Sequence, residues 1–328
     1  MSSVAVIGAG AWGTALAIQA ARAGNAVTLW ARDPARAEAI RASRENPRLP
    51  GIRLPEPILA TSAMPETADA ALLAVPTQHL RRVLGRLPIG LAPLVVCAKG
   101  VEQTTLRLPL EIAADVRPGT PSAILTGPNF AHEIAAGLPA AAVVAASDAG
   151  LRTSIAALLG TPSFRLYGND DPIGAQVGGA AKNVIAIAAG AVTGAGLGEN
   201  ARAALITRGL AELSRLAVAL GGRAETVMGL SGLGDLLLTC TGPASRNYSL
   251  GLALGRGEQL ADVLAARSAV TEGVTTAPAL VARAAAPGST PGASVDLPIC
   301  AAVASLLAGH TSLAEAITAL LARPRRDE

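Results

Sequence analysis

Apolar and polar positions alternate in short blocks along the first half of the chain. Short continuous apolar runs are typical of strands that are buried on both faces, and they alternate here with stretches of helical spacing. The predicted strands are residues 4–7, 26–30, 71–75, 94–98, 123–126 and 141–145, and the helical stretches between the first of them are 14–22 and 34–43. This rhythm predicts an α/β domain with a mostly parallel, doubly wound sheet.

The pattern changes near Gly178, where long Ala- and Leu-rich stretches begin and strand-like runs nearly vanish. The predicted helices are residues 180–192, 201–220, 260–266, 277–285, 298–307 and 312–321. We therefore predict a sheet domain over residues 1–177 and an all-α domain over residues 178–328. The Pro- and Gly-rich segment 286–294 is predicted to be a loop inside the second domain.

Composition narrows the possible class of protein. Hydrophobic residues make up 51% of the 328 residues and charged residues 16%, which indicates a packed globular protein. Aromatic residues are 2% and the net charge is +3, without a long basic run, so a nucleic-acid surface is not expected. The distant cysteines Cys97, Cys240 and Cys300 favour free thiols in a reducing compartment. With no signal-peptide pattern at the start, we expect a cytoplasmic protein.

The first predicted strand runs directly into Gly8-Ala9-Gly10-Ala11-Trp12-Gly13, and a helical stretch follows. In this context the G-x-G-x-x-G spacing predicts dinucleotide binding. Gly8 makes the tight turn, Gly10 lets the backbone approach the pyrophosphate, and Gly13 lets the helix pack close to the strand. A glycine-rich turn without a ligand is the alternative interpretation.

The second predicted strand ends in Trp30-Ala31-Arg32-Asp33, where an acid normally bonds the adenosine ribose. Arg32 is placed to meet a 2′-phosphate, which favours NADP over NAD, although use of both cofactors stays open. An exposed, solvated Arg/Asp pair is the alternative interpretation.

Lysine is rare in this chain, since Lys99 and Lys182 are the only lysines among 27 Lys and Arg residues. Arginine stays protonated, whereas a buried lysine can act as an acid or base, so both lysines are candidates for proton transfer or contact with an anion. Drift toward arginine is the alternative explanation. Lys99 follows a predicted strand, at the edge where doubly wound sheets bind ligands.

Lys182 lies in Gly178-Gly179-Ala180-Ala181-Lys182-Asn183, at the start of a predicted helix. We predict that it occupies the first turn, where the positive end of the helix dipole lowers the pKa of a lysine. Such a position destabilises the helix. It is therefore easier to explain by general acid–base catalysis than by folding.

Further motifs run through the rest of the chain. Together with those above, they are residues 4–17, 98–102, 127–131 (Gly-Pro-Asn-Phe-Ala), 178–184, 203–212, 229–241 (including Gly232-Leu233-Gly234-Asp235-Leu236), 245–247 (Ser-Arg-Asn) and 270–273. With these motifs, in this order over essentially its whole length, the chain resembles the bacterial-type NAD(P)-dependent glycerol-3-phosphate dehydrogenases.

The resemblance implies a Rossmann-type domain followed by an all-α domain, a fold similar to that of 6-phosphogluconate dehydrogenase. It implies reversible hydride transfer between NAD(P)H and dihydroxyacetone phosphate, which gives sn-glycerol 3-phosphate for glycerophospholipid synthesis. A homodimer is the family expectation, and no membrane span is expected. No metal is predicted, because His79, His132 and His310 do not cluster with acids at metal-ligand spacing.

The resemblance also assigns roles to residues, with Lys182 as the proton donor and acceptor. The implied substrate contacts are Lys99, Gly127, Asn129, Lys182, Asp235, Ser245, Arg246 and Asn247. The implied cofactor contacts are Gly8, Gly10, Ala11, Trp12, Gly13, Arg32, Arg48, Lys99, Ala131, Arg246, Val270 and Glu272. These residue types fit the chemistry, because a lysine ammonium can protonate a developing alkoxide and Ser-Arg-Asn can bind a phosphate dianion. Taken without the resemblance, Ser245 is a better candidate for a helix N-cap.

The chain departs from the family pattern at three places. Asn129 stands where Ser or Thr is usual, and Arg48 stands where an aromatic residue is common. Gly242-Pro243 replaces a stretch that carries serine. A guanidinium at position 48 in place of an aromatic ring would strengthen the NADP preference.

Two other functions are compatible with parts of the pattern. Another two-domain lysine dehydrogenase, such as a β-hydroxyacid dehydrogenase, would share the Gly-rich Lys-Asn helix, but the Ser-Arg-Asn set argues against it. A non-catalytic NADP-binding redox sensor would keep the glycine loop but would have no reason to keep Lys182 in a strained position.

Overall fold

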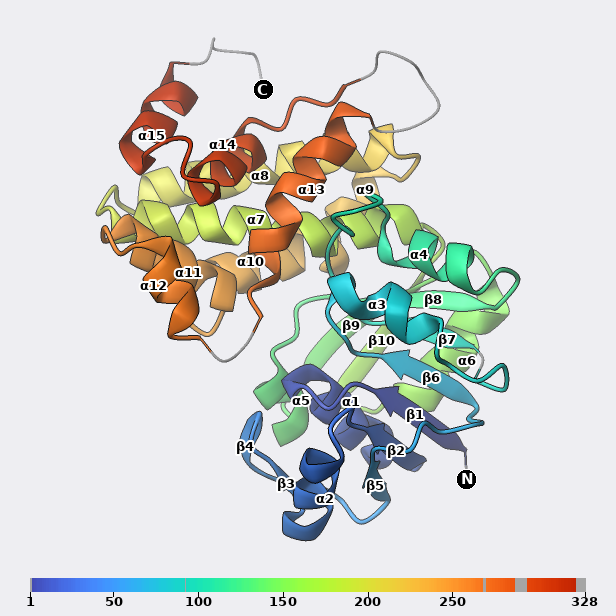
Figure 1. Cartoon of the computed structure of the whole chain (residues 1–328). Coiled ribbons are helices and arrows are strands. Elements are labelled where there is room, and N and C mark those ends of the chain that lie inside the picture. Colours follow the sequence, from blue (N-terminus) through green and yellow to red (C-terminus); the bar gives the residue numbers. More distant parts are fainter. Residues whose placement is uncertain (1, 92, 268–269, 287–293, 323–328) are drawn as a thin grey trace. The chain divides into compact units, whose positions relative to one another are not determined.

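The computed structural model describes residues 2–91, 93–267, 270–286 and 294–322. By its contacts the chain divides into two compact units, coloured along the sequence in Figure 1. The first unit comprises Met1–Lys99 and Arg107–Gln176, and the second comprises Gly100–Leu106 and Val177–Glu328. The sequence pattern does not predict that Gly100–Leu106 belongs with the second unit. Most of the predicted loop 286–294 lies outside the described residues.

The first unit is built on a sheet. Its strands are β1 (Ser3–Ile7), β2 (Ala26–Trp30), β5 (Ile58–Thr61), β6 (Ala70–Leu73), β7 (Leu94–Val96), β8 (Ser122–Thr126), β9 (Ala140–Ala145) and β10 (Phe164–Asn169). They lie in the order β10-β9-β8-β7-β6-β1-β2-β5, and neighbours are parallel except for β8 and β9, which are antiparallel. A separate antiparallel pair joins β3 (Glu45–Asn46) to β4 (Leu49–Arg53).

The helices of this unit are α1 (Ala11–Arg22), α2 (Pro34–Ser43), α3 (Thr77–Leu84), α4 (Pro109–Val116), α5 (Ala131–Ala136) and α6 (Ala149–Leu159). Val4 and Val6 of β1 belong to a core cluster that also contains buried residues of α1. Their neighbours Ala5 and Ile7 are equally buried, and successive side chains of a strand point to opposite faces of the sheet. The sheet is therefore covered on both faces, as the continuous apolar runs predict.

The parallel strands bring several predicted site residues to one edge of the sheet. Gly8 follows β1, Arg32 follows β2 shortly afterwards, Lys99 follows β7 and Gly127 follows β8. These four strands are parallel to one another in the sheet, so their carboxyl ends meet at the same edge. This is the edge at which doubly wound sheets bind ligands.

The second unit is helical. Its elements are α7 (Pro172–Gly194), which begins at the end of the first unit, α8 (Glu199–Ala219), α9 (Ala224–Val227), the π-helix η1 (Leu230–Gly234), α10 (Asp235–Cys240), α11 (Arg246–Gly255), α12 (Leu260–Ala265), α13 (Glu272–Ala285), α14 (Pro298–Leu307) and α15 (Leu313–Leu321). An α/β unit followed by a helical unit confirms the predicted fold class.

Helix α7 is the core of the helical unit, and residues 174–192 are buried all along it. Glycines allow α11 to cross it closely. A Cβ atom on Gly190 would stand 2.0 Å from the Tyr248 carbonyl oxygen, and one on Gly251 would stand 1.9 Å from the Ile187 carbonyl oxygen. Any other residue at these two positions would force the helices apart.

The start of α7 differs from the prediction. The sequence pattern places a helix start at residue 180, but α7 begins at Pro172, and the Asp171 carboxylate accepts the Gly174 N–H at 2.8 Å. Proline fits the first helical position, and the adjacent aspartate satisfies a free N–H there. Gly178 and Gly179 lie inside the helix instead of before it. Lys182 is consequently about three turns into α7.

By length and hydropathy α7 resembles a membrane-spanning helix, and among the described helices it is the one that passes such a test. In its most apolar window, 89% of the residues are buried inside the protein. Core helices of soluble proteins have the same property, so this resemblance is weak evidence of a membrane span.

Candidate active site

The glycine loop between β1 and α1 has the geometry of a dinucleotide site. Gly8 has a φ of +119°, and a Cβ on Gly13 would stand 1.9 Å from the Gly8 carbonyl oxygen, so helix and strand pack in contact. A Cβ on Gly10 would meet nothing within 4 Å. Gly10 is the N-cap of α1 and makes no side-chain cap bond, and the first turn of the helix holds no acid. The open space above an uncapped helix N-terminus fits a pyrophosphate.

The β3–β4 segment packs against this loop through Asn46, which is fully buried. The Asn46 Nδ2 donates to the Ala9 carbonyl oxygen at 3.2 Å and to the Thr14 hydroxyl at 2.6 Å. Arg36 on α2 donates from Nη2 to the same Ala9 oxygen at 2.5 Å. The middle of the glycine loop is thus held from outside by two side chains.

Sequence reasoning missed both Arg36 and Asn46. A signal for Arg36 exists in the sequence, because it is the third residue of α2, which begins at Pro34 and has no acid in its first turn. A cation is unfavourable at this end of a helix. Asn46 gives no such signal, because its role depends on a contact with a loop 37 residues earlier.

Of the charged residues near the end of β2, Asp33 caps a helix, whereas Arg32 is exposed. The Asp33 carboxylate accepts the Ala35 N–H at 3.0 Å and so caps α2. Arg32 and Arg48 are exposed, and the backbone N–H of Arg48 donates to the Asn46 Oδ1 at 3.1 Å. An acid is therefore present here, but it serves the helix N-terminus.

Lys99 and Gly127 are brought into contact. The Lys99 ammonium donates to the Gly127 carbonyl oxygen at 3.0 Å, and Gly127 has a φ of +128°. Asn129 donates from Nδ2 to the Ala141 carbonyl oxygen at 3.1 Å. Its Oδ1 is buried and has no hydrogen-bond partner among the described residues. Ala131 is the first residue of α5.

Lys182 is 9% exposed and is held by two side chains of α10. Its ammonium lies 2.6 Å from the Asp235 Oδ1 and 2.8 Å from the Thr239 hydroxyl. The same hydroxyl donates to the Asp235 backbone oxygen at 2.6 Å, so its lone pair faces the lysine. Asp235 is fully buried. Because the lysine lies about three turns into α7, the predicted dipole effect on its pKa does not apply, since that effect falls off within the first turn.

The contact between Lys182 and Asp235 depends on close packing of the π-helix. A Cβ on Gly178 would stand 2.5 Å from the Ser231 carbonyl oxygen, and one on Gly232 would stand 1.9 Å from the Val227 carbonyl oxygen. Glycine at both positions lets η1 lie against α7 and α9. Asp235 directly follows η1, so this packing places its carboxylate at the lysine.

Ser245, Arg246 and Asn247 begin α11. Ser245 is the N-cap, and its hydroxyl accepts the Tyr248 N–H at 3.2 Å. The structure thus gives it the capping role that the sequence favours without the resemblance. The Asn247 Nδ2 donates to the Asn183 Oδ1 at 2.8 Å, and its Oδ1 accepts the Gly273 N–H at 2.9 Å. Asn247 therefore ties α7 to the start of α13, where Glu272 lies.

The three cysteines do not supply a nucleophile. All are buried free thiols. Burial raises the pKa of Cys240 to about 12 although the charge of Lys182 opposes the shift, and burial raises that of Cys97 to about 12 against the charge of Lys99. Cys300 is shifted in the same direction by burial. Thiols with such pKa values stay protonated near neutral pH.

The sequence-predicted residues fall into two groups by unit. The first unit contains Gly8, Gly10, Ala11, Trp12, Gly13, Arg32, Arg48, Lys99, Gly127, Asn129 and Ala131. The second unit contains Lys182, Asp235, Ser245, Arg246, Asn247, Val270 and Glu272. Within the units, direct contacts join Lys99 to Gly127 and Lys182 to Asp235. Val270 is 47% exposed.

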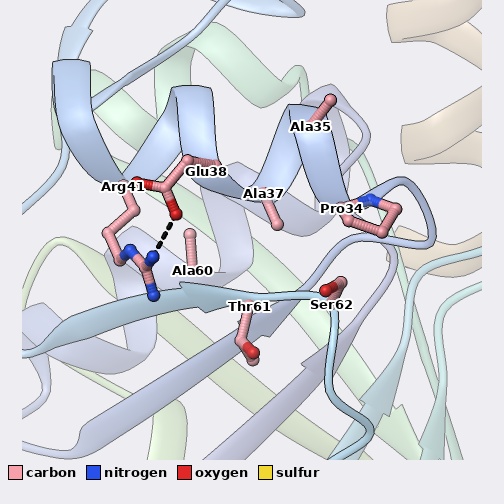
Figure 2. Close-up of a pocket in the computed structure, with 8 residues that line it drawn as sticks. All are labelled: Pro34, Ala35, Ala37, Glu38, Arg41, Ala60, Thr61 and Ser62. Carbon is pink, nitrogen blue, oxygen red and sulfur yellow. Dashed lines mark hydrogen bonds and ion pairs between the residues drawn. The ribbon is translucent and has the colours of Figure 1, made fainter.

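A hollow of about 400 Å³ lies elsewhere in the first unit, between α2 and β5 (Figure 2). Its lining residues are Pro34, Ala35, Ala37, Glu38, Arg41, Ala60, Thr61 and Ser62. Figure 2 shows Glu38 and Arg41 joined by an ion pair beside it. None of the predicted site residues lines this hollow.

Comparison with known proteins identifies similar chains over nearly the full length. Residues 3–151 match the family described as NAD-dependent glycerol-3-phosphate dehydrogenase N-terminus, and residues 171–318 match the corresponding C-terminus. Glycerol-3-phosphate dehydrogenase [NAD(P)+] of Acidiphilium cryptum is 59% identical, over 99% of this chain and 98% of its own length. The enzyme of the same name from Gluconobacter oxydans is 54% identical, over 98% of this chain and 97% of its own.

Among solved structures, the chain is likewise similar to a glycerol-3-phosphate dehydrogenase over nearly its full length. The crystal structure of glycerol-3-phosphate dehydrogenase from Coxiella burnetii matches with a TM-score of 0.92 and 36% identity, covering 98% of this chain and 99% of that one. A D-mandelate dehydrogenase structure matches with a TM-score of 0.60 at 14% identity, which shows a shared fold alone.

Proposed function

This chain belongs to the NAD-dependent glycerol-3-phosphate dehydrogenase family, and we propose that it interconverts dihydroxyacetone phosphate and sn-glycerol 3-phosphate by hydride transfer with NAD(P)H. The observation that carries the proposal is the buried Lys182 ammonium, held 2.6 Å from Asp235 and 2.8 Å from Thr239. In a chain with two lysines, this one is buried and fixed by a carboxylate and a hydroxyl, which supports a role as a positioned general acid.

Lys182 is proposed to move the proton. The nicotinamide cofactor, when bound, supplies the hydride to the carbonyl carbon of dihydroxyacetone phosphate. The carbonyl oxygen then gains negative charge, and the Lys182 ammonium stabilises that charge and donates a proton to it. In the reverse direction the neutral amine takes the proton from the substrate hydroxyl. Asp235 and Thr239 act as positioning residues, because they fix the ammonium through two hydrogen bonds.

The phosphate of the substrate is assigned to the start of α11. Ser245, Arg246 and Asn247 combine a hydroxyl, a guanidinium and an amide there, and the N-terminus of a helix favours an anion. Ser245 and Asn247 also have structural bonds, so these two side chains are held in place before any ligand arrives. Lys99, Gly127 and Asn129 are proposed to contribute further substrate contacts.

The cofactor is assigned to the glycine loop, with Trp12, Arg32, Arg48, Lys99, Ala131, Arg246, Val270 and Glu272 as further contacts. NADP is proposed as the preferred form. Two observations support this preference. Asp33, the acid near the end of β2, is engaged as the N-cap of α2, and the exposed side chains of Arg32 and Arg48 carry positive charge. A 2′-phosphate is better matched by guanidinium groups than by an acid.

The cellular setting is also a proposal. The product sn-glycerol 3-phosphate is the backbone of glycerophospholipids, so we assign the enzyme to their synthesis. We further propose that it is a cytoplasmic homodimer, which needs no metal.

The test is oxidation of NADPH, followed at 340 nm, by the purified protein with dihydroxyacetone phosphate. The proposal predicts turnover with this substrate and far slower turnover with unphosphorylated dihydroxyacetone, because the Ser-Arg-Asn set would have no anion to bind. No turnover, or equal turnover with both substrates, would contradict it.

A further inference from the structure

Arg36 is an arginine to which neither the sequence motifs nor the proposed function assigns a role. It lies in the first turn of α2 and reaches back to the glycine loop, where its Nη2 donates to the Ala9 carbonyl oxygen at 2.5 Å and to the Asn46 Oδ1 at 3.1 Å. Both bonds use Nη2. Within the described residues, the Nη1 and Nε donors of its planar fork therefore remain for another acceptor.

Arg48 is fixed beside Arg36 by the same buried amide. The backbone N–H of Arg48 and the Nη2 of Arg36 both donate to the Asn46 Oδ1, each at 3.1 Å. Asn46 is fully buried and also bonds the glycine loop through its Nδ2. One side chain thus sets the spacing between the loop and the two arginines.

Positive charge gathers at this place against electrostatic repulsion. Burial lowers the pKa of the Arg36 guanidinium, and the charge of Arg48 lowers it further, while Asp33 partly opposes the shift. Asp33 is engaged as the N-cap of α2. Like charges held together beside a nucleotide loop are stabilised when an anion binds between them.

We propose that Arg36 is a specificity-determining residue that binds, together with Arg48 and Arg32, the 2′-phosphate of NADPH. The proposal rests on the NADP preference proposed above. It identifies Arg36 as a further residue that contacts the 2′-phosphate, from the side of the glycine loop. A guanidinium fork suits this role because it can hold the loop with one nitrogen and bind phosphate oxygens with the others.

The experiment compares binding of two cofactor fragments, 2′,5′-ADP and 5′-AMP, by isothermal titration calorimetry. These fragments carry no nicotinamide, so the readout is independent of turnover. The variant is Arg36→Gln, which removes the guanidinium and its charge but keeps a polar side chain on α2. The matched control is Arg41→Gln on the same helix, since Arg41 is paired with Glu38 at the hollow in Figure 2.

The parent protein and Arg41→Gln are expected to bind 2′,5′-ADP more tightly than 5′-AMP. Arg36→Gln is expected to reduce this ratio by roughly 10- to 100-fold, the effect of losing hydrogen bonds to a charged group, while 5′-AMP binding changes little. If Arg36→Gln keeps the parent's ratio of affinities for the two fragments, Arg36 does not bind the 2′-phosphate. If Arg36→Gln weakens the binding of both fragments equally, Arg36 only supports the glycine loop, which also overturns the proposal. A parent that binds both fragments equally overturns the NADP preference itself.

Discussion

The carbonyl oxygen of Ser231 lies 2.5 Å from the point where a Cβ atom would stand on Gly178. At this point the backbone of the π-helix η1 packs directly against the backbone of the core helix α7. Four residues beyond Ser231, Asp235 reaches Lys182, which lies one turn beyond Gly178 on the same helix. The glycine therefore determines whether the lysine and its carboxylate can meet.

Replacing Gly178 with alanine should separate them. Alanine favours a helix over glycine by about 1 kcal/mol, but the new Cβ must displace backbone, and such overpacking destabilises by roughly 1–3 kcal/mol. We expect a lower free energy of unfolding in urea together with a lower kcat. Gly242→Ala is the control, because a Cβ there meets nothing within 4 Å. A Gly178→Ala protein with the parent's stability and kcat would show that the contact does not matter.

Thr239 should affect turnover without affecting cofactor binding. Thr239→Val keeps the shape but removes the hydroxyl that accepts from Lys182 at 2.8 Å. A hydrogen bond to a charged group contributes about 1.5–3 kcal/mol, so kcat should fall by roughly tenfold or more with the KM for NADPH unchanged. Thr241→Val is the matched control, since the Thr241 hydroxyl bonds the Leu237 carbonyl oxygen and is exposed. Equal kcat values for the two variants would exclude the proposed role of Thr239.

Glu212 of α8 makes stability depend on pH. Its buried carboxylate accepts the N–H groups of Ile299 at 2.7 Å and Cys300 at 3.1 Å, at the start of α14. Burial raises the pKa of Glu212 above its ordinary value of 4.5, and these hydrogen bonds oppose the shift only in part. Between the unfolded and the folded pKa the native state binds more protons than the unfolded chain, so stability falls as pH rises through that window.

The comparison that isolates this effect uses Glu212→Gln, which cannot titrate. The difference in unfolding free energy, parent minus variant, should become smaller as the pH rises from about 4 to about 7. Denaturant unfolding at several pH values measures it, and other titrating groups cancel in the difference. A difference that stays constant or grows with pH would contradict the raised pKa.

The fold was predictable because it depends on local pattern. Continuous apolar runs identified β1 and β2, and the glycine spacing identified the loop between β1 and α1. The start of α7 was not predictable in this way, because two adjacent glycines normally end or precede a helix. Their tolerance inside α7 depends on the backbone of Ser231, which lies 53 residues further along the chain from Gly178. Lys182 was identified, but for a reason that its place in the helix does not support.

The abundance of arginine also has a structural explanation that composition could not reveal. Arg22 donates to the carbonyl oxygens of Ile134 and Ala135, and Arg117 donates to those of Leu87 and Pro88. A planar fork can bind two neighbouring carbonyls, which a lysine ammonium does less well. Which carbonyls are bound depends on long-range packing. The sequence marks Arg36 as an unfavourably placed cation near the start of α2, but it does not show which carbonyl oxygen Arg22, Arg117 or Arg36 binds.

The role of Lys182 as the acid and base is tested most directly by turnover of Lys182→Arg. Arginine keeps the positive charge, so NADPH binding, followed by fluorescence titration, should stay within a few-fold of the parent. Arginine does not release a proton at accessible pH, so kcat for NADPH oxidation with dihydroxyacetone phosphate should fall by about 10²–10⁴-fold. A Lys182→Arg protein that turns over at a rate near the parent's would contradict the role assigned to Lys182.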